Sequence, residues 1–267
     1  MTLELKSPAD DRKKLSVPER ACHLAVPFNG TISSGEVEYP IRNNIIDLIG
    51  GKESSYSIAQ QSNQWTLTAK LYEELWRNRS LSILTGEEFP IEKERDLLLE
   101  WTDPQPGETW LDIGCSTGLY ARMLVRKEPS IRMLALDASE QMLAEAKTRA
   151  EAEAADLFLI RADARNLPLF SQEADGLVMG GTLNELTDDL KVLFECRRVL
   201  KQQGIFFMMH LVRAETWYGR LFQDSAEWGG LTFRSVEESN RLFERAGFRV
   251  EEQLTRSIVC FTKLRPV

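Results

Sequence analysis

The stretch Trp110–Tyr120 has residue types and spacings that could hold a small polar ligand. A short apolar run ends at Gly114, and Gly118 precedes a series of helix-forming residues. A strand that enters a helix through such a glycine turn presents free backbone N–H groups, which can bind a polar or anionic group. Asp112 in this stretch would repel a pyrophosphate but attract a cationic amine. The chemistry therefore favours a nucleoside that carries an amino acid over a dinucleotide.

Two further acidic residues follow predicted strands. Asp137 directly ends the apolar run 132–136, and Asp163 comes after the run 157–161. In a doubly wound sheet the ligand binds at the carboxyl ends of the strands, where a carboxylate after the second strand can accept both ribose hydroxyls. A single aspartate at such a place is as often a helix cap or a turn former. Together with Asp112 and the glycine turn, the two favour a ligand site.

Alternating strands and helices must position these residues. Apolar runs without polar alternation predict strands buried on both faces, and strand–helix alternation predicts a doubly wound sheet. We expect an α/β fold with a Rossmann-like sheet of seven strands, the last antiparallel, and a small β-rich N-terminal appendage. The expected strands are 109–113, 132–136, 157–161, 176–179, 205–210, 248–253 and 257–262, and the expected helices are 119–127, 139–153, 188–200 and 235–246.

The chain divides into four segments by composition. Residues 1–20 are charged and polar, and we expect a flexible tail there. Residues 21–51 contain short apolar pieces between turn residues, which predict the β-rich appendage. Residues 52–107 predict a linker and a helical lid, in which Trp65–Trp76 has helical spacing. Residues 108–267 form the expected ligand-binding domain.

The bulk composition excludes several classes of protein. The 267-residue chain has a formal net charge of −8, which gives no general attraction for nucleic acid. No apolar run approaches the roughly 20 residues that span a bilayer, and we see no secretory signal. The four cysteines are widely scattered, which favours free thiols in a reducing, cytoplasmic compartment and no metal site. The sequence leaves the oligomeric state open.

Leu111–Gly118 is the first of five motifs that occur in order along the chain. The other four are 134–143, 161–168, 174–178 and 198–204. Together they resemble the motifs of class I S-adenosylmethionine-dependent methyltransferases, of the methyltransferase domain types 11 and 25. The likeness covers roughly residues 90–265. A nicotinamide dehydrogenase is disfavoured, because the turn lacks the G-x-G-x-x-G pattern.

The resemblance implies S-adenosyl-L-methionine as the cofactor. Asp112, Gly114 and Gly118 would then shape the loop around the methionine part of the cofactor. Cys115 and Ser116 lie within the same loop, and Ser116 stands where the family most often has glycine.

The later motifs imply contacts with the nucleoside part. Asp137 would bind the ribose hydroxyls, with Ala138 and Met142 near the adenine. Asp163 would accept a hydrogen bond from the adenine amino group, beside the backbone of Ala164.

The chain also resembles two narrower groups. One is the ubiquinone- and menaquinone-biosynthesis type of methyltransferase. The other comprises uncharacterised methyltransferases of plastids and cyanobacteria with a degenerate zinc-ribbon-like N-terminus, a likeness that the stretch 39–48 carries. The metal-binding cysteines of a zinc ribbon are missing here. We therefore expect residues 21–51 to be a metal-free remnant.

Methyl transfer from a sulfonium depends mainly on alignment, an effect worth up to about 7–11 kcal/mol. Gly180, after the fourth strand, would let the backbone approach the sulfonium region. A catalytic base is needed only if the acceptor must lose a proton. The candidates are His210, which ends the fifth strand, and Glu185, shortly after the fourth. The structural alternative for His210 is a histidine satisfied by local hydrogen bonds. For Glu185 it is a residue in the first turn of a short helix.

The segment after His210 is rich in aromatic residues, which predicts large apolar contacts with a substrate, although ordinary core packing explains the same residues. We expect a methyltransferase that acts on a small, lipophilic or aromatic acceptor. The alternative is a catalytically silent module that binds the cofactor or a partner without turnover.

Overall fold

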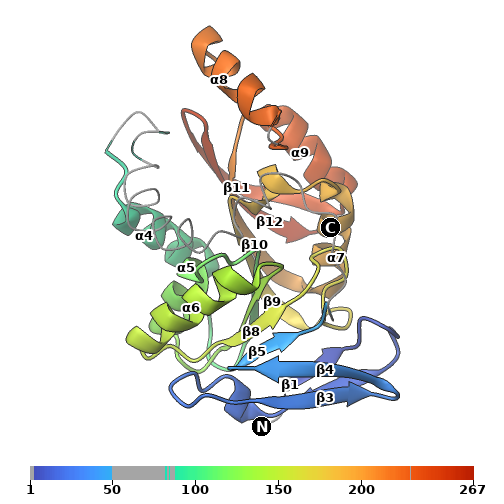
Figure 1. The fold of residues 1–267 in the computed structure, drawn as a ribbon. Coiled ribbons are helices and arrows are strands. Elements are labelled where there is room, and N and C mark those ends of the chain that lie inside the picture. The colour runs from blue at the N-terminus through green and yellow to red at the C-terminus, as the bar shows by residue number, and fades with distance from the viewer. Residues whose placement is uncertain (1–2, 50–81, 83, 85–87, 229) are drawn as a thin grey trace.

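The computed structural model describes residues 3–49, 82, 84, 88–228 and 230–267 (Figure 1). Ten strands of this part of the chain form one sheet. They are β3 (Gly30–Ser34), β4 (Val37–Arg42), β5 (Ile45–Asp47), β6 (Thr109–Ile113), β7 (Arg132–Asp137), β8 (Phe158–Arg161), β9 (Ala174–Gly180), β10 (Leu200–Leu211), β11 (Phe248–Arg256) and β12 (Val259–Pro266).

The strands lie in the order β11-β12-β10-β9-β6-β7-β8-β5-β4-β3. All neighbours from β10 to β5 are parallel, so their carboxyl ends meet at one edge. β12 is inserted antiparallel between β10 and β11. The seven strands β6–β12 therefore confirm the predicted Rossmann-like sheet with its antiparallel last strand.

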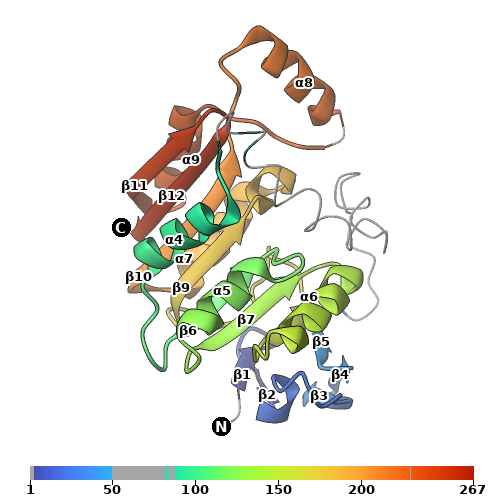
Figure 2. The ribbon, with the colours of Figure 1, turned by 90° about the vertical axis from the view of Figure 1, so that its left-hand side faces the viewer.

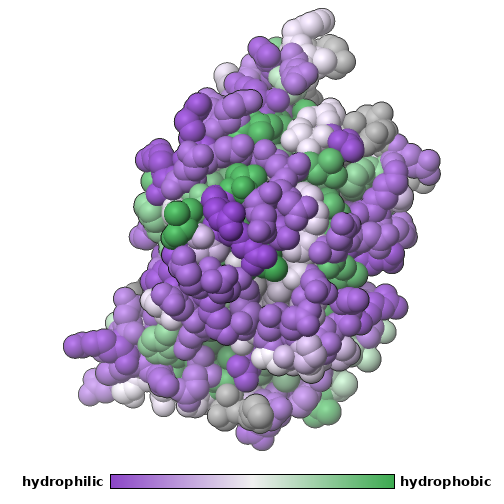
Figure 3. Space-filling view, turned by 180° about the vertical axis from the view of Figure 1, so that it is seen from behind, coloured by the Kyte–Doolittle hydropathy of each residue, from purple (hydrophilic) through white to green (hydrophobic). Residues whose placement is uncertain are grey.

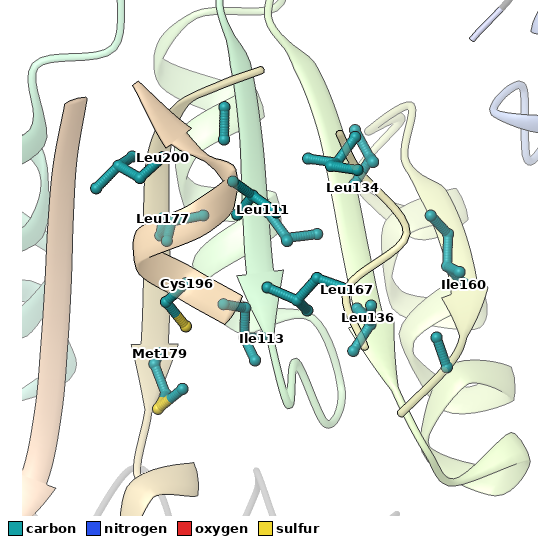
Figure 4. Packing of buried hydrophobic residues seen from close by; sticks show 14 of the residues in the cluster. Leu111, Ile113, Leu134, Leu136, Ile160, Leu167, Leu177, Met179, Cys196 and Leu200 are labelled. Atoms are coloured by element: carbon teal, nitrogen blue, oxygen red, sulfur yellow. The ribbon is translucent and has the colours of Figure 1, made fainter. Parts of the chain in front are cut away.

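Helices cover both faces of the sheet (Figure 2). One face carries α4 (Ile91–Thr102), α5 (Leu119–Lys127) and α6 (Glu140–Ala152), and the other carries α7 (Asp189–Val199) and α9 (Val236–Arg245). On the second face, strand side chains such as Leu111 and Leu177 lie beside Cys196 of α7 (Figure 4). All five residues of β6 are buried, as the unbroken apolar run predicts.

Local signals start the helices where the sequence places them. The Ser139 hydroxyl accepts a hydrogen bond from the Met142 N–H at the start of α6. At the start of α9, Ser235 and Glu238 form a reciprocal capping box. Each cap satisfies N–H groups that the first turn of a helix leaves without a partner.

The β-rich N-terminal segment is present and is joined to the main sheet. β5 pairs in parallel with β8, and β4 and β3 continue the sheet as antiparallel strands. The β3–β4 hairpin turns at Gly35, whose φ is +66°. The buried side chains of Ile32 and Ile46 belong to the same hydrophobic cluster as those of the central strands. The segment therefore extends the sheet instead of standing apart from it.

The prediction of a flexible tail over residues 1–20 is wrong for the described residues. β1 (Leu3–Lys6) and β2 (Lys14–Val17) form an antiparallel pair on the face covered by α7 and α9. Leu5 and Leu15 are fully buried there. The strands alternate apolar and polar residues, but each has four residues, and the charged loop between them conceals that pattern.

The segment 52–107 is described only in part. α4 lies in the described part of this segment, whereas the predicted linker and the helix expected at 65–76 lie outside the described residues. After β10, the aromatic segment forms α8 (Trp217–Glu227). No described helix is long and apolar enough to cross a membrane. The face seen from behind is mostly hydrophilic, with small hydrophobic patches (Figure 3).

Replacing Leu5 with alanine tests whether the β1–β2 pair is part of the core. The side chain is fully buried, so we expect the free energy of unfolding to fall by about 2–5 kcal/mol. Val26→Ala is the matched control, because Val26 is 68% exposed and should change it by less than about 0.5 kcal/mol. Urea denaturation measures both. Equal, small effects for the two variants would show that the pair is not packed as described.

Candidate functional site

The end of β6 and the turn that follows it place Asp112 and two glycines at the carboxyl edge of the sheet. Asp112 is buried, and its Oδ2 accepts a hydrogen bond from the Ala121 N–H at 3.1 Å. Gly114 and Gly118 have φ values of +66° and +75°. A side chain is strained in that region, which explains why glycine occupies both positions. The carboxylate is therefore fixed against the first turn of α5.

Ser116 also has a left-handed backbone, with a φ of +50°. This conformation costs an L-residue about 1 kcal/mol, which is a physical reason for the glycine that the resemblance expects here. The Ser116 N–H donates to Oδ2 of Asp137 at 2.8 Å, and its hydroxyl donates to Sδ of the buried Met142 at 3.5 Å. The serine therefore adopts the required turn and links it to the next strand.

Cys115 lies in the same turn but is closed off. Its N–H donates to the Leu136 carbonyl at 2.9 Å, which ties the end of β6 to β7. Burial, followed by the charges of Asp137 and Asp112, raises the pKa of its thiol well above the usual value. The thiol therefore stays protonated and packs as a small apolar group.

Asp137 ends β7 and holds two turns together. Its Oδ1 accepts from the Ser139 N–H at 2.8 Å, while Oδ2 accepts from Ser116. Burial raises the pKa of this carboxyl, and the backbone hydrogen bonds oppose that shift. The carbonyl of Ala138 accepts a hydrogen bond from Nε of Arg161 at 3.2 Å. Each carboxylate oxygen has capacity for a further donor such as a sugar hydroxyl.

Asp163 follows β8 and is half-buried. Nε and Nη2 of Arg165 donate to its two oxygens at 2.9 and 2.7 Å. Burial by itself would raise the pKa of Asp163, but the hydrogen bonds and charge of Arg165 hold it below its usual value. Ala164 packs against the hydrophobic core, and the Ala162 N–H donates to the Asp137 carbonyl at 3.1 Å. The structure therefore brings the third acidic residue beside the second.

Gly180 ends β9 at the same edge, before the short 3-10 helix η3 (Thr182–Glu185). The Thr182 hydroxyl donates to the Gly114 carbonyl at 3.1 Å. A Cβ on Gly114 would lie 2.3 Å from that hydroxyl oxygen, so glycine is required there. Sequence reasoning missed Thr182; the signal was a hydroxyl residue directly after two glycines at a strand end.

The sequence around this site matches a known protein family. The model of the methyltransferase domain family matches residues 111–208, which run from β6 into β10. Residues 111–208 form a methyltransferase domain. All five motifs that carried the resemblance lie inside this match, and the sheet order agrees with it.

Curated relatives of the methyltransferase domain include quinone-related enzymes. The demethylmenaquinone methyltransferase of Thermotoga maritima is 36% identical over 109 residues, covering 41% of this chain and 46% of the relative. The chloroplastic 2-methyl-6-phytyl-1,4-hydroquinone methyltransferase of Arabidopsis thaliana is 29% identical over 208 residues, covering 76% and 60%. The chain spans between 40% and 60% of the length of the first five curated relatives.

Solved structures share the fold at low identity. Phosphoethanolamine N-methyltransferase 2 of Haemonchus contortus, in complex with phosphomonomethylethanolamine and S-adenosylhomocysteine, superposes with a TM-score of 0.63 at 14% identity. The match covers 81% of this chain and 60% of that one.

Glu185 lies at the end of η3, partly buried near the carboxyl edge of the methyltransferase domain. Burial, followed by the charge of Asp137, raises the pKa of its carboxyl to about 7. The neighbouring Asn184 fixes η3: its Nδ2 donates to the carbonyls of Leu211 and Thr232 at 2.8 and 2.7 Å. Glu185 is therefore held in place and titrates close to neutral pH.

His210, near the end of β10, is buried against α9. The residue is 1% exposed, and its ring packs edge-on against Phe243 of α9 at 5.7 Å between centroids. Among the described residues neither ring nitrogen has a hydrogen-bond partner. Burial, followed by the charge of Arg234, lowers the pKa of the ring to about 4. His210 is therefore neutral at pH 7 and separated from solvent.

The neutral, buried state of His210 predicts how stability depends on pH. The unfolded ring has a pKa of about 6.5, so between pH 6.5 and 4 the unfolded chain binds a proton that the folded protein does not. We therefore expect His210 to lower the free energy of unfolding by about 3 kcal/mol as the pH falls through that window. His210→Leu should remove this part of the pH dependence. Urea denaturation from pH 4 to 8 measures it, and parallel curves for both proteins would refute the assignment.

Proposed function

We propose that this protein transfers a methyl group from S-adenosyl-L-methionine to a small, lipophilic aromatic acceptor of the quinone or hydroquinone type. The observation that carries the proposal is the set of carboxylates around the glycine turn of a methyltransferase domain. Relatives named for demethylmenaquinone, 2-phytyl-1,4-naphthoquinone and 2-methyl-6-phytyl-1,4-hydroquinone support the acceptor class.

The residues present fit this cofactor. Asp112 is a fixed carboxylate suited to the amino group of the methionine part, beside the turn that contains Gly114, Cys115, Ser116 and Gly118. Buried carboxylates require such partners, because an isolated buried charge is costly. We assign these residues to the methionine half of the site, with Gly180 closing it from β9.

The nucleoside half lies along β7 and β8. Asp137 has hydrogen-bonding capacity left for the ribose hydroxyls, and Ala138 and Met142 flank it. Asp163 and the backbone of Ala164 are assigned to the adenine. Arg165 keeps Asp163 ionised and oriented, which suits a carboxylate that accepts from an amino group.

When bound, S-adenosyl-L-methionine supplies an electrophilic methyl group on a sulfonium. A hydroquinone methylated on carbon must lose a ring proton, so a base is required. Glu185 meets the requirements of geometry and pKa, since it lies at the edge that carries Asp137 and titrates near 7. His210 meets neither, because its ring is enclosed between β10 and α9.

The surroundings of the site support a lipophilic acceptor. α8 follows the carboxyl end of β10 and exposes Trp217 (77%), Leu221 (65%) and Trp228, which directly follows the helix (91%). These side chains provide apolar contact area for a ring with a hydrocarbon tail.

All four cysteines are buried free thiols, which supports a reducing compartment such as the cytoplasm.

Calorimetric titration with S-adenosylhomocysteine tests the cofactor site. We expect the native chain to bind, and Asp137→Ala to weaken binding by about 10- to 100-fold, because hydrogen bonds to a charged group are lost. The control is Asp156→Ala, since Asp156 is exposed and pairs with His23 far from the turn. Transfer of labelled methyl groups to a demethylated naphthoquinol tests the acceptor. No binding at millimolar ligand would refute the proposal.

Glu185→Gln tests the base. We expect kcat to fall by about 10²- to 10⁴-fold with unchanged affinity for S-adenosylhomocysteine, because the amide cannot accept the proton. In the native chain kcat should rise with pH through about 7, as the carboxyl loses its proton, and this step should be absent from the variant. Glu215→Gln, at an exposed residue before α8, serves as the control. Unchanged kcat in Glu185→Gln would exclude the role.

A further inference from the structure

A row of alternating charges crosses the carboxyl ends of three neighbouring strands. Asp137 of β7 is in register with Arg161 of β8, and Arg161 is in register with Asp47 of β5. Residues in register on adjacent strands point to the same face of the sheet. Of these three residues, Asp137 alone is among the proposed cofactor contacts. Arg161 and Asp47 are not.

Arg161 is held from both sides of this row. Its Nη1 donates to Oδ2 of Asp47 at 3.1 Å, and its Nε donates to the Ala138 carbonyl at 3.2 Å. The side chains of Arg161 and Asp47 are 20% and 8% exposed, so solvent screens their contact weakly. The other oxygen of Asp47 accepts from the Ile49 N–H at 3.1 Å, which fixes the carboxylate.

The Ala138 carbonyl belongs to the same planar peptide unit as the Ser139 N–H. That N–H donates to Oδ1 of Asp137 at 2.8 Å. Arg161 and Asp137 therefore hold opposite ends of one peptide plane. A change in the position of Arg161 would rotate the plane and shift the N–H that orients the Asp137 carboxylate.

We propose that Asp47 is a positioning residue for the nucleoside half of the cofactor site, acting through Arg161 on the peptide between Ala138 and Ser139. This inference rests on the proposed function. An arginine side chain has many rotamers, and the buried carboxylate selects the one that reaches Ala138. The N-terminal strand β5 is then part of the cofactor-binding unit, although its residues contact no cofactor directly.

Arg42 supplies a matched control. Its Nη1 lies 3.6 Å from Oδ2 of Asp47, so it also pairs with that carboxylate. Its side chain is 65% exposed, and it belongs to β4, one strand further from the site. Replacing Arg42 with alanine removes one positive charge beside Asp47 and leaves the hydrogen bond from Arg161 to Asp47 in place.

A double-mutant cycle on the full chain tests the proposal, with calorimetric titration of S-adenosylhomocysteine and of methylthioadenosine. The second ligand keeps the nucleoside and lacks the amino acid. We expect Asp47→Ala to raise Kd about five- to tenfold for both ligands, since it removes one charged hydrogen bond. Combined with Arg161→Ala it should add less than twofold, because both act through one link. Arg42→Ala should stay within twofold of the native chain.

Three results would overturn the inference: Kd unchanged in Asp47→Ala, additive effects in the double variant, or an effect on S-adenosylhomocysteine alone. Thermal unfolding of each variant shows whether it is folded. Should Asp47→Ala not fold, Asp47→Asn replaces it, because it keeps the volume and an acceptor oxygen. We expect Asp47→Asn to raise Kd about twofold to fivefold for both ligands. An unchanged Kd in that variant would also overturn the inference. If the native chain bound neither ligand, the proposed function would fail, and this inference with it.

Discussion

The site depends on one partly buried carboxylate that joins two turns. Asp137 receives the Ser116 N–H from the turn after β6 and the Ser139 N–H from the turn after its own strand, both at 2.8 Å. Burial disfavours its charge, and two N–H donors offset much of that cost. Neither turn could move alone without breaking one of these bonds. The geometry of the methyltransferase domain at this edge therefore follows from satisfying a single charge.

Burial shifts the two titratable groups near this edge in opposite directions. It raises the pKa of Glu185 to about 7 and lowers that of His210 to about 4, because it disfavours the charged form of each. Only the carboxyl therefore changes its protonation state near neutral pH. Sequence reasoning listed both as candidates, since both follow strands that end at the site. Chain position could not reveal that His210 points into the packing between β10 and α9.

The central part of the fold could be predicted because its signals are local. The bounds of β6 and α5 agree with the expected ones, since an unbroken apolar run and a glycine turn define them. The N-terminal strands differ, because their stability comes from distant partners. Lys6 is buried, and its ammonium group donates hydrogen bonds to Asp11 and to Asn166, which lies 160 residues away in the chain. From the sequence alone, a lysine of this kind is expected to lie in solvent, because its distant partner is not known.

The same limit explains why Arg161 and Asp47 were missed: they are 114 residues apart in the chain. Their contact exists because β5 pairs with β8, which also satisfies backbone groups that an edge strand would leave exposed. The N-terminal segment packs Tyr39, Ile41 and other apolar side chains into the main cluster. That packing supplies the apolar contacts that a small β-unit of this length cannot provide alone. Removing the segment would therefore uncover the edge of β8, open the core, and release Arg161 from the loop that follows Asp137.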